Sequence, residues 1–285
     1  MPGHRTILSF SWTLFVALAL TACSAAAASS ESVTQSDPTS TAKAHPITLN
    51  VFAAASLTEA FTQIGKNFES QHPGVHVIFN FAGSQALEQQ ILAAAPADVF
   101  ASAAQQQIDS LSQAGQLGSQ PAKVFVKNQL VVIFPVTNPG KIRTLQDLAK
   151  PGLKLVLADK AVPVGQYSLD FMDKADLDPV FGPTFKQKVL KNVVSYEDNV
   201  KSVLAKVSLD EADAGIVYTT DVTPYAATKV TELDIPMALN IVATYPIATL
   251  KHSTHPDLAQ AFVDAVLSPE GQAVLSRYGF IPPNQ

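Results

Sequence analysis

Residues 47–92 have the sequence ITLNVFAAASLTEAFTQIGKNFESQHPGVHVIFNFAGSQALEQQIL, and this stretch decides the fold. Ile47 to Phe52 and Val75 to Phe81 are rich in β-branched and aromatic residues, which is typical of strands. Apolar residues recur at helical spacing from Leu57 to Glu69, and Gln85 to Ala94 predicts a second helix. This alternation predicts parallel strands with helices packed on both faces of the sheet.

The same alternation continues through the rest of the chain. Short β-rich runs predict strands at 98–101, 130–134, 153–158, 193–194 and 214–218. Helical patterns occur at 105–114, 145–148, 168–175, 200–207 and 257–278. We therefore predict an α/β protein with two lobes, each built on a parallel sheet.

Two serines follow consecutive predicted strands, each after a run of small residues. Ala53-Ala-Ala-Ser56 ends the first strand, and Ala82-Gly-Ser84 ends the next. A serine at a helix start places free N–H groups and the positive end of the helix dipole nearby. In open α/β sheets, ligands bind beyond the carboxyl ends of the strands. These turns predict an anion site, although simple helix capping is the alternative for either serine alone.

Six short segments carry a resemblance to a known family. They are Ala53-Ala-Ala-Ser56-Leu57, Phe81-Ala-Gly-Ser84-Gln85, Ala95-Pro-Ala-Asp98-Val-Phe-Ala-Ser102, Val162-Pro-Val-Gly165-Gln-Tyr167, Glu197-Asp-Asn-Val200 and Ala214-Gly-Ile-Val-Tyr218. Their order resembles the periplasmic molybdate-binding protein of ABC transporters from about Ile47 to Pro283. The resemblance implies a type II periplasmic binding protein fold with a ligand cleft between the two lobes. Lobe 1 would comprise 47–127 and 240–285, and lobe 2 would comprise 128–239.

The resemblance also implies which residues hold the ligand. Ser56 and Ser84 would donate from backbone and hydroxyl groups, Val164 and Val200 from backbone N–H groups, and Tyr218 from its phenol. The ligand would be molybdate or tungstate, held by these five residues as an oxyanion, with no direct metal ligand and no cofactor. Valine at position 164 departs from the smaller alanine of the family.

A pocket made only of donors has a chemical consequence. Molybdate, tungstate and sulfate carry no proton at neutral pH, whereas phosphate keeps one and needs an acceptor for it. Pocket size must then exclude sulfate. The function implied is capture of molybdate for an ABC permease by a monomeric protein that is not an enzyme. Two alternatives stay open: a binding protein for another tetrahedral oxyanion such as sulfate, and a serine hydrolase in which Ser56 or Ser84 is the nucleophile and a histidine the base.

The N-terminus predicts export. An apolar stretch from Ile7 to Leu20 is too short to span a membrane and is typical of a signal peptide. Leu20-Thr-Ala-Cys23 resembles a bacterial lipobox, so we expect a signal peptide at 1–22, an acylated Cys23 and a flexible tether at 23–46. The protein would be periplasmic or at the cell surface, anchored by lipid. The alternative is a plain signal peptide with a coincidental cysteine.

Composition excludes several classes of protein. The 285 residues carry a formal net charge of -5 and no basic cluster that could hold nucleic acid. One cysteine excludes a disulfide framework and a thiolate metal site. His252 and His255 have spacing that could bind a metal, and Asp210 to Asp213 could hold Ca²⁺, but a surface loop and a solvated turn are preferred. Asp98 could face the cleft, although a structural cap is preferred.

Overall fold

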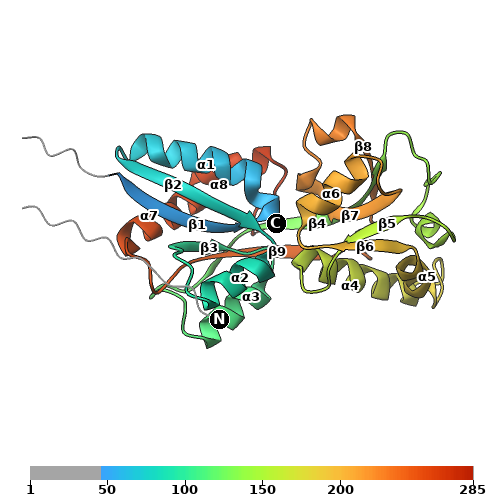
Figure 1. Cartoon of the computed structure of the whole chain (residues 1–285), viewed down its shortest axis with the longest axis horizontal. Coiled ribbons are helices and arrows are strands. Elements are labelled where there is room, and N and C mark those ends of the chain that lie inside the picture. Colours follow the sequence, from blue (N-terminus) through green and yellow to red (C-terminus); the bar gives the residue numbers. More distant parts are fainter. Residues whose placement is uncertain (1–45, 285) are drawn as a thin grey trace, which may run out of the picture. The chain divides into compact units, whose positions relative to one another are not determined.

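The computed structural model describes residues 46–284, which form two lobes joined by two long strands (Figure 1). The predicted signal peptide, Cys23 and all but the last residue of the tether lie outside this range. The elements of lobe 1 are β1 (Ile47–Ala54), η1 (Ala55–Leu57), α1 (Thr58–Gln71), β2 (Val75–Ala82), α2 (Ser84–Leu92), β3 (Val99–Ala101), α3 (Gln105–Gln113), α7 (Pro256–Leu267) and α8 (Pro269–Arg277).

Lobe 2 is inserted between α3 and α7. Its elements are η2 (Leu145–Ala149), β5 (Leu155–Ala158), α4 (Pro163–Leu177), α5 (Phe185–Lys191), β6 (Val193–Glu197), α6 (Val200–Ser208), β7 (Ala214–Tyr218), η3 (Thr219–Asp221), η4 (Ala226–Thr228) and β8 (Val230–Asp234). The connecting strands are β4 (Lys123–Pro135) and β9 (Val242–Thr249). Within residues 46–284, no helix combines the length and apolar character needed to cross a bilayer.

The strands follow the order β2-β1-β3-β9-β4-β7-β5-β6, with β8 beside β4. The predicted α/β class is confirmed, and the sheets, which were predicted to be parallel, also contain antiparallel pairs. Strand β1 pairs in parallel with β2 and β3, and β5 pairs in parallel with β6 and β7. Strand β9 is antiparallel to β3 and β4, and β4 is antiparallel to β7 and β8. The two strands that carry the chain out and back run in opposite directions, so they introduce antiparallel pairs into both lobes.

The passage between the lobes occurs inside strand β4. Its first half pairs with β9 as far as Gln129 opposite Val242, and from Leu130 onward it pairs with β7. The Asn240 side chain accepts a hydrogen bond from the Leu130 N–H (3.0 Å) and donates one to the Leu130 carbonyl (2.9 Å). The hydrogen-bonded pairing therefore continues through the crossing between the lobes. The exact boundaries of the two lobes, 127/128 and 239/240, stay a prediction.

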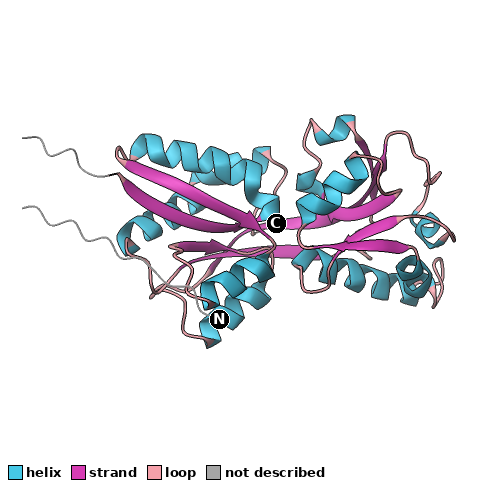
Figure 2. Cartoon of the chain, in the orientation of Figure 1, coloured by secondary structure: helices cyan, strands magenta, loops and turns pink. Residues whose placement is uncertain are grey.

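Helices cover both faces of each lobe (Figure 2). In lobe 1, α1, α7 and α8 pack together on one face, where Phe68 meets Phe262 edge-on with ring centroids 5.3 Å apart. Helices α2 and α3 cover the other face around Leu87 and Phe100, both fully buried. In lobe 2, α4 and α6 contact the strands on which they pack, β5 and β7. Packing against the strands holds each helix in place. This matters because four helices begin at the cleft between the lobes.

Two predicted helices have different bounds in the structure. The single tail helix expected at 257–278 is two helices, because Pro269 has no N–H to donate and starts α8. The hydroxyl of Ser268 caps α8 by accepting from the N–H of Gly271 at 3.1 Å. Helix α4 begins at Pro163, five residues before the predicted start at Ser168. That earlier start brings Val164 into the first turn of a helix.

Candidate functional site

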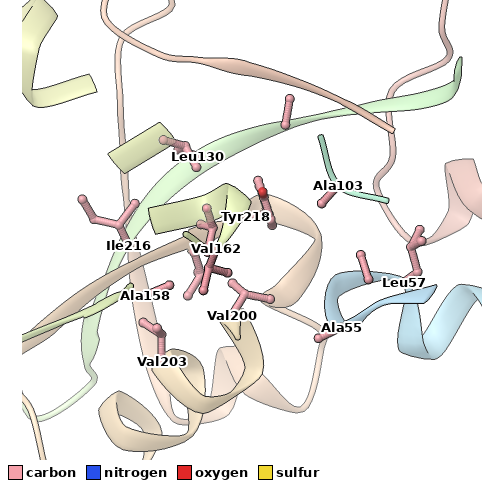
Figure 3. Packing of buried hydrophobic residues seen from close by; sticks show 14 of the residues in the cluster. Ala55, Leu57, Ala103, Leu130, Ala158, Val162, Val200, Val203, Ile216 and Tyr218 are labelled. Atoms are coloured by element: carbon pink, nitrogen blue, oxygen red, sulfur yellow. The ribbon is translucent and has the colours of Figure 1, made fainter. Parts of the chain in front are cut away.

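The five residues predicted to hold the ligand line one small cavity between the lobes. Its empty volume is about 210 Å³, against 570 to 1130 Å³ for four other hollows on the described part of the chain. In Figure 3, Val162, Val200 and Tyr218 of lobe 2 lie across from Ala55 and Ala103 of lobe 1. The full lining is Ala54, Ala55, Ser56, Ala82, Gly83, Ser84, Ala103, Val162, Pro163, Val164, Val200 and Tyr218. No charged side chain lines the cavity.

Four helices begin at this cavity. Ser56 lies in η1, which leads into α1, and Ser84 is the first residue of α2. Val164 is the second residue of α4, and Val200 is the first of α6. The first N–H groups of a helix have no acceptor within that helix, and they form the positive end of its dipole. The backbone therefore gives the cavity hydrogen-bond donors and partial positive charge without using lysine or arginine.

The hydroxyls of the two serines are not used for helix capping, so the simple-capping alternative is wrong for both. Neither η1, α1 nor α2 has a side-chain hydrogen bond at its N-cap. Instead, Ser84 Oγ accepts from the N–H of Ala103 at 3.0 Å. Ser56 Oγ lies 2.9 Å from the phenol oxygen of Tyr245 on β9. Both serines are almost fully buried, so their hydroxyls contact protein groups and the cavity rather than bulk water.

Tyr218, the last residue of β7, ends at the cavity with its phenol oxygen unpaired. The side chain is 1% exposed, and within the described residues the oxygen has no hydrogen-bond partner. Burial raises the pKa of Tyr218 well above its usual value, and nearby Tyr245, Tyr167 and Asp221 raise it further. The phenol is therefore neutral and keeps its proton. A buried hydroxyl without a partner is costly, so this O–H marks a position that a ligand oxygen would occupy.

Val164 lines the cavity despite being larger than the alanine expected there. It is 1% exposed, and its carbonyl accepts a hydrogen bond from Ser168 Oγ at 2.7 Å within α4. Its N–H belongs to the first helical turn and has no intrahelical acceptor. The valine side chain therefore narrows the cavity without removing the backbone donor.

Sequence reasoning missed an ion-pair cluster that joins the lobes beside the cavity. Lys201 Nζ of α6 lies 2.9 Å from Glu59 Oε1 of α1 and 3.2 Å from Asp221 Oδ1 of η3. Asp221 is fully buried, and its other oxygen accepts from the N–H of Tyr218 at 3.1 Å. Tyr218 and Asp221 are three positions apart, but Tyr-x-x-Asp is not a capping-box sequence, so no local pattern pointed to this pair either. Glu59 and Lys201 are 142 positions apart, and no local pattern connects them.

The pKa values in this cluster reflect burial and the paired charges. Burial raises the pKa of Asp221, and Lys201 and the Tyr218 N–H offset only part of that effect. Burial alone would lower the pKa of Lys201, but the carboxylates of Asp221 and Glu59 outweigh it and raise that pKa. The cluster has two carboxyl groups for one ammonium, so it adds no net positive charge to the cavity.

Two further contacts hold the lobes together at the cavity mouth. The side-chain amide of Gln85 donates to the carbonyl of Asp198 at 3.0 Å. The phenol of Tyr167 donates to the carbonyl of Ala103 at 3.3 Å. With the Glu59–Lys201 pair, these contacts join the lobes at three separate points, so the structure is a closed form.

Comparison with known proteins assigns this arrangement to a family. A family model described as bacterial extracellular solute-binding protein matches residues 49–281. The molybdate-binding protein ModA of Mycobacterium tuberculosis (strain H37Rv) is 42% identical over 233 residues, covering 82% of this chain and 84% of that protein. This chain is a member of the ModA family of bacterial extracellular solute-binding proteins. Members of this family are solute-binding proteins, so the family assignment confirms the prediction that the chain is not an enzyme.

Solved structures confirm the predicted periplasmic binding protein fold of this ModA-family chain. The sulfate-binding protein SubI from Mycobacterium tuberculosis H37Rv superposes with a TM-score of 0.74 at 18% identity, covering 84% of this chain and 88% of that one. The periplasmic molybdate-binding protein of Azotobacter vinelandii superposes with a TM-score of 0.71 at 19% identity, covering 82% and 99%. At these identities the likeness concerns the fold alone.

The remaining polar clusters of the sequence have structural roles in this ModA-family fold. Asp98 accepts hydrogen bonds from the N–H of Asn50 (2.7 Å) and from Ser253 Oγ (2.6 Å), so it ties β1 to the loop before α7. Asp213 accepts from the N–H of Lys154 at 2.8 Å. Among residues 46–284, no group of three or more His, Cys, Asp or Glu side chains could hold a metal ion. The hydroxyls of Ser56 and Ser84 have the phenol of Tyr245 and the N–H of Ala103 as hydrogen-bond neighbours, not the histidine that the hydrolase alternative requires.

Proposed function

We propose that the protein captures molybdate, and tungstate with it, in the cavity between the lobes. The observation that carries this proposal is an uncharged cavity at which two serine hydroxyls, a buried unpaired phenol and four helix starts come together. Ser56, Ser84, Val164, Val200 and Tyr218 would supply the donors. The molybdate-binding relative at 42% identity supports the choice of anion.

An anion with two charges can be held in such a cavity because hydrogen bonds to a charged acceptor are strong. Each charge-assisted bond is shorter and about twice as strong as a neutral one. Removing a dianion from water is costly, and only a full set of oriented donors offsets that cost. The helix starts provide donors whose positions are fixed by packing, so little reorganisation is needed on binding.

Delivery and anchoring complete the proposed function. The closed protein would dock on an ABC permease, which would receive the anion when the lobes separate. Cys23 would be acylated after removal of residues 1–22 and would hold the protein at a membrane surface through its tether. The Leu20-Thr-Ala-Cys23 motif supports this part of the proposal.

The proposed ligand is tested by calorimetric titration of the purified protein. We expect molybdate and tungstate to bind at one site per chain at micromolar concentrations or below. Sulfate should bind at least about 100-fold more weakly, and phosphate should bind more weakly than sulfate, because its proton would meet only donors. Absence of heat with molybdate and tungstate would contradict the proposal, and tighter binding of sulfate than of molybdate would reassign the site to sulfate.

The proposed anchor is tested by replacing the cysteine in the full-length chain. Expressed in a bacterial host, the natural chain should incorporate a radiolabelled fatty acid and sediment with membranes. Cys23→Ser should abolish both, because serine has no thiol to acylate. Ser24→Ala is the matched control and should keep the label. Equal membrane association of the Cys23→Ser and natural chains would show that Cys23 is not the anchor.

A further inference from the structure

Both serines of the cavity accept a hydrogen bond from the protein, and this determines where their own protons point. A serine hydroxyl has one proton to donate and lone pairs with which to accept. Ser84 Oγ accepts from a backbone N–H, that of Ala103, which can only donate. The Ser84 proton must therefore go to a different partner. The cavity, which Ser84 lines, provides that place.

The proton on Ser56 is directed by a longer chain of hydrogen bonds, which begins at Asn128. The Asn128 side chain is fully buried at the crossing between the lobes. Its oxygen accepts from the N–H of Gln129 (2.9 Å) and from Thr219 Oγ1 (3.2 Å). Because a backbone N–H can only donate, this contact fixes which end of the amide is oxygen. The amide nitrogen therefore faces Thr220 Oγ1 (2.8 Å) and the phenol oxygen of Tyr245 (3.4 Å).

The phenol of Tyr245 passes this direction on to Ser56. An amide nitrogen only donates, so the Tyr245 oxygen accepts from Asn128 and its proton needs another acceptor. Ser56 Oγ lies 2.9 Å away and is that acceptor. Ser56 then donates its own proton away from Tyr245, towards the cavity that it lines. The chain of donation runs from Asn128 to Tyr245, to Ser56 and on to the ligand.

We propose that Tyr245, oriented by Asn128, locks the Ser56 hydroxyl as a donor to the cavity and thereby makes the site reject oxyanions that carry a proton. Tyr245 and Asn128 are positioning residues, because neither lines the cavity. This inference rests on the proposed function, since it concerns how the same cavity distinguishes among anions. A freely rotating serine could turn a lone pair towards the proton of phosphate, whereas a locked serine cannot.

The surroundings of Tyr245 keep it in the protonated form that this role requires. The ring is completely buried and packs edge-on against Phe125, Tyr218 and Phe280. Burial raises the pKa of Tyr245 far above its usual value, and the nearby Asp221 carboxylate raises it further. The phenol therefore holds a proton to donate at neutral pH.

The substitution Tyr245→Phe tests this inference, because it removes one oxygen and keeps the packed ring. We expect molybdate affinity to fall about tenfold, because Ser56 is no longer preorganised. Binding of phosphate relative to sulfate should rise about tenfold, measured where phosphate is the monoprotonated dianion. In the Ser56→Ala background, removal of the Tyr245 hydroxyl should leave the phosphate-to-sulfate ratio unchanged. The measurements are calorimetric titrations of all four proteins with the three anions.

Two controls make the result decisive. Tyr196→Phe, on an exposed tyrosine of β6, should change nothing. Asn128→Asp provides a second route. Its carboxylate would accept a hydrogen bond from the Tyr245 phenol, so Ser56 would have to donate to the Tyr245 oxygen and would turn a lone pair to the cavity. Its loss of molybdate affinity should be partly relieved in the Ser56→Ala background.

An unchanged phosphate-to-sulfate ratio in both Tyr245→Phe and Asn128→Asp would overturn the inference while wild-type molybdate binding still stands. Failure of the wild-type protein to bind molybdate would instead overturn the proposed function.

Discussion

Replacing Gly83 with alanine is expected to weaken molybdate binding by about 10- to 100-fold while leaving the fold intact, which is the effect of overpacking a tight contact. A Cβ atom at this position would lie 2.4 Å from the carbonyl oxygen of Asp198, a backbone atom of the opposite lobe. It would also lie 2.5 Å from the Gln85 side chain, which can move aside. The backbone of Gly83 has φ -60° and ψ 137°, values that alanine adopts freely. The clash therefore exists only when the lobes are closed.

The measurement combines affinity with compaction. Calorimetry gives the dissociation constant, and small-angle X-ray scattering shows whether saturating molybdate still reduces the radius of gyration. Gly152→Ala is the matched control, because Gly152 has φ +89° and no atom near its missing side chain. That control should lose about 1 kcal/mol of stability and keep its affinity. Unchanged affinity in Gly83→Ala would show that the lobes bind the anion without the closed contact seen here.

Replacing Lys201 with methionine is expected to lower the free energy of unfolding by about 3 kcal/mol. Methionine keeps the approximate length of the side chain but leaves the fully buried Asp221 without its ion-pair partner. An uncompensated buried carboxylate either stays charged at a large cost or takes up a proton. Burial already raises the pKa of Asp221, and loss of Lys201 would raise it further.

The pH dependence of this deficit has a definite sign. A carboxyl group whose pKa is higher in the folded than in the unfolded protein binds more protons when folded, so its effect on stability worsens as pH rises. Lys201→Met should therefore be closest to wild type at acidic pH and least stable near neutral pH. Chemical denaturation at several pH values measures this. A deficit that does not grow between acidic and neutral pH would contradict the role given to Asp221.

Two companion variants separate the effect of the Lys201–Asp221 pair on the stability of lobe 2 from the effect of the Glu59–Lys201 pair on closure of the lobes. Lys201→Met combined with Asp221→Asn should recover much of the lost stability, because no buried charge remains. Glu59→Gln should keep wild-type stability, since Glu59 is partly exposed and the Lys201–Asp221 pair survives. It should weaken molybdate binding only a few-fold, because a half-exposed ion pair contributes little. Equal effects of Glu59→Gln and Lys201→Met on stability would show that the bridge between lobes is the dominant part of the cluster.

Local sequence patterns were sufficient for the features that depend on neighbouring residues. Alternation of strands and helices predicted the α/β class, and small residues before Ser56 and Ser84 predicted helix starts at an anion site. The structure brings those serines together with Val164, Val200 and Tyr218 in one cavity. Their roles as donors to an anion stay a prediction. The break before Pro269 was visible in the sequence, but the amphipathic pattern on both sides obscured it.

Features that depend on distant contacts could not be predicted in this way. Tyr245 and Ser56 are 189 positions apart, and Asn128 and Tyr245 are 117 apart. Strand β9 gives no sign in its own residues that it returns antiparallel beside β4, because pairing partners are chosen by the whole fold. The direction of the hydrogen bond at Ser56 depends on the side chains of Ser56, Tyr245 and Asn128, which come from separate segments of the chain. Such a network becomes visible only once the chain is folded.

The ladder between β4 and β9, which has one bulge between Val124 and Val126, makes the connection between the lobes a paired ribbon rather than a loose joint. Asn240 extends the hydrogen bonding past the end of this ladder, so the crossing has no unpaired gap at which the chain could swivel. Separation of the lobes must then be spread as small changes in twist over many residues, each costing little. Opening of this kind keeps the hydrogen bonds of the ribbon paired, so the two halves of the cavity can separate without breaking the strands that join them.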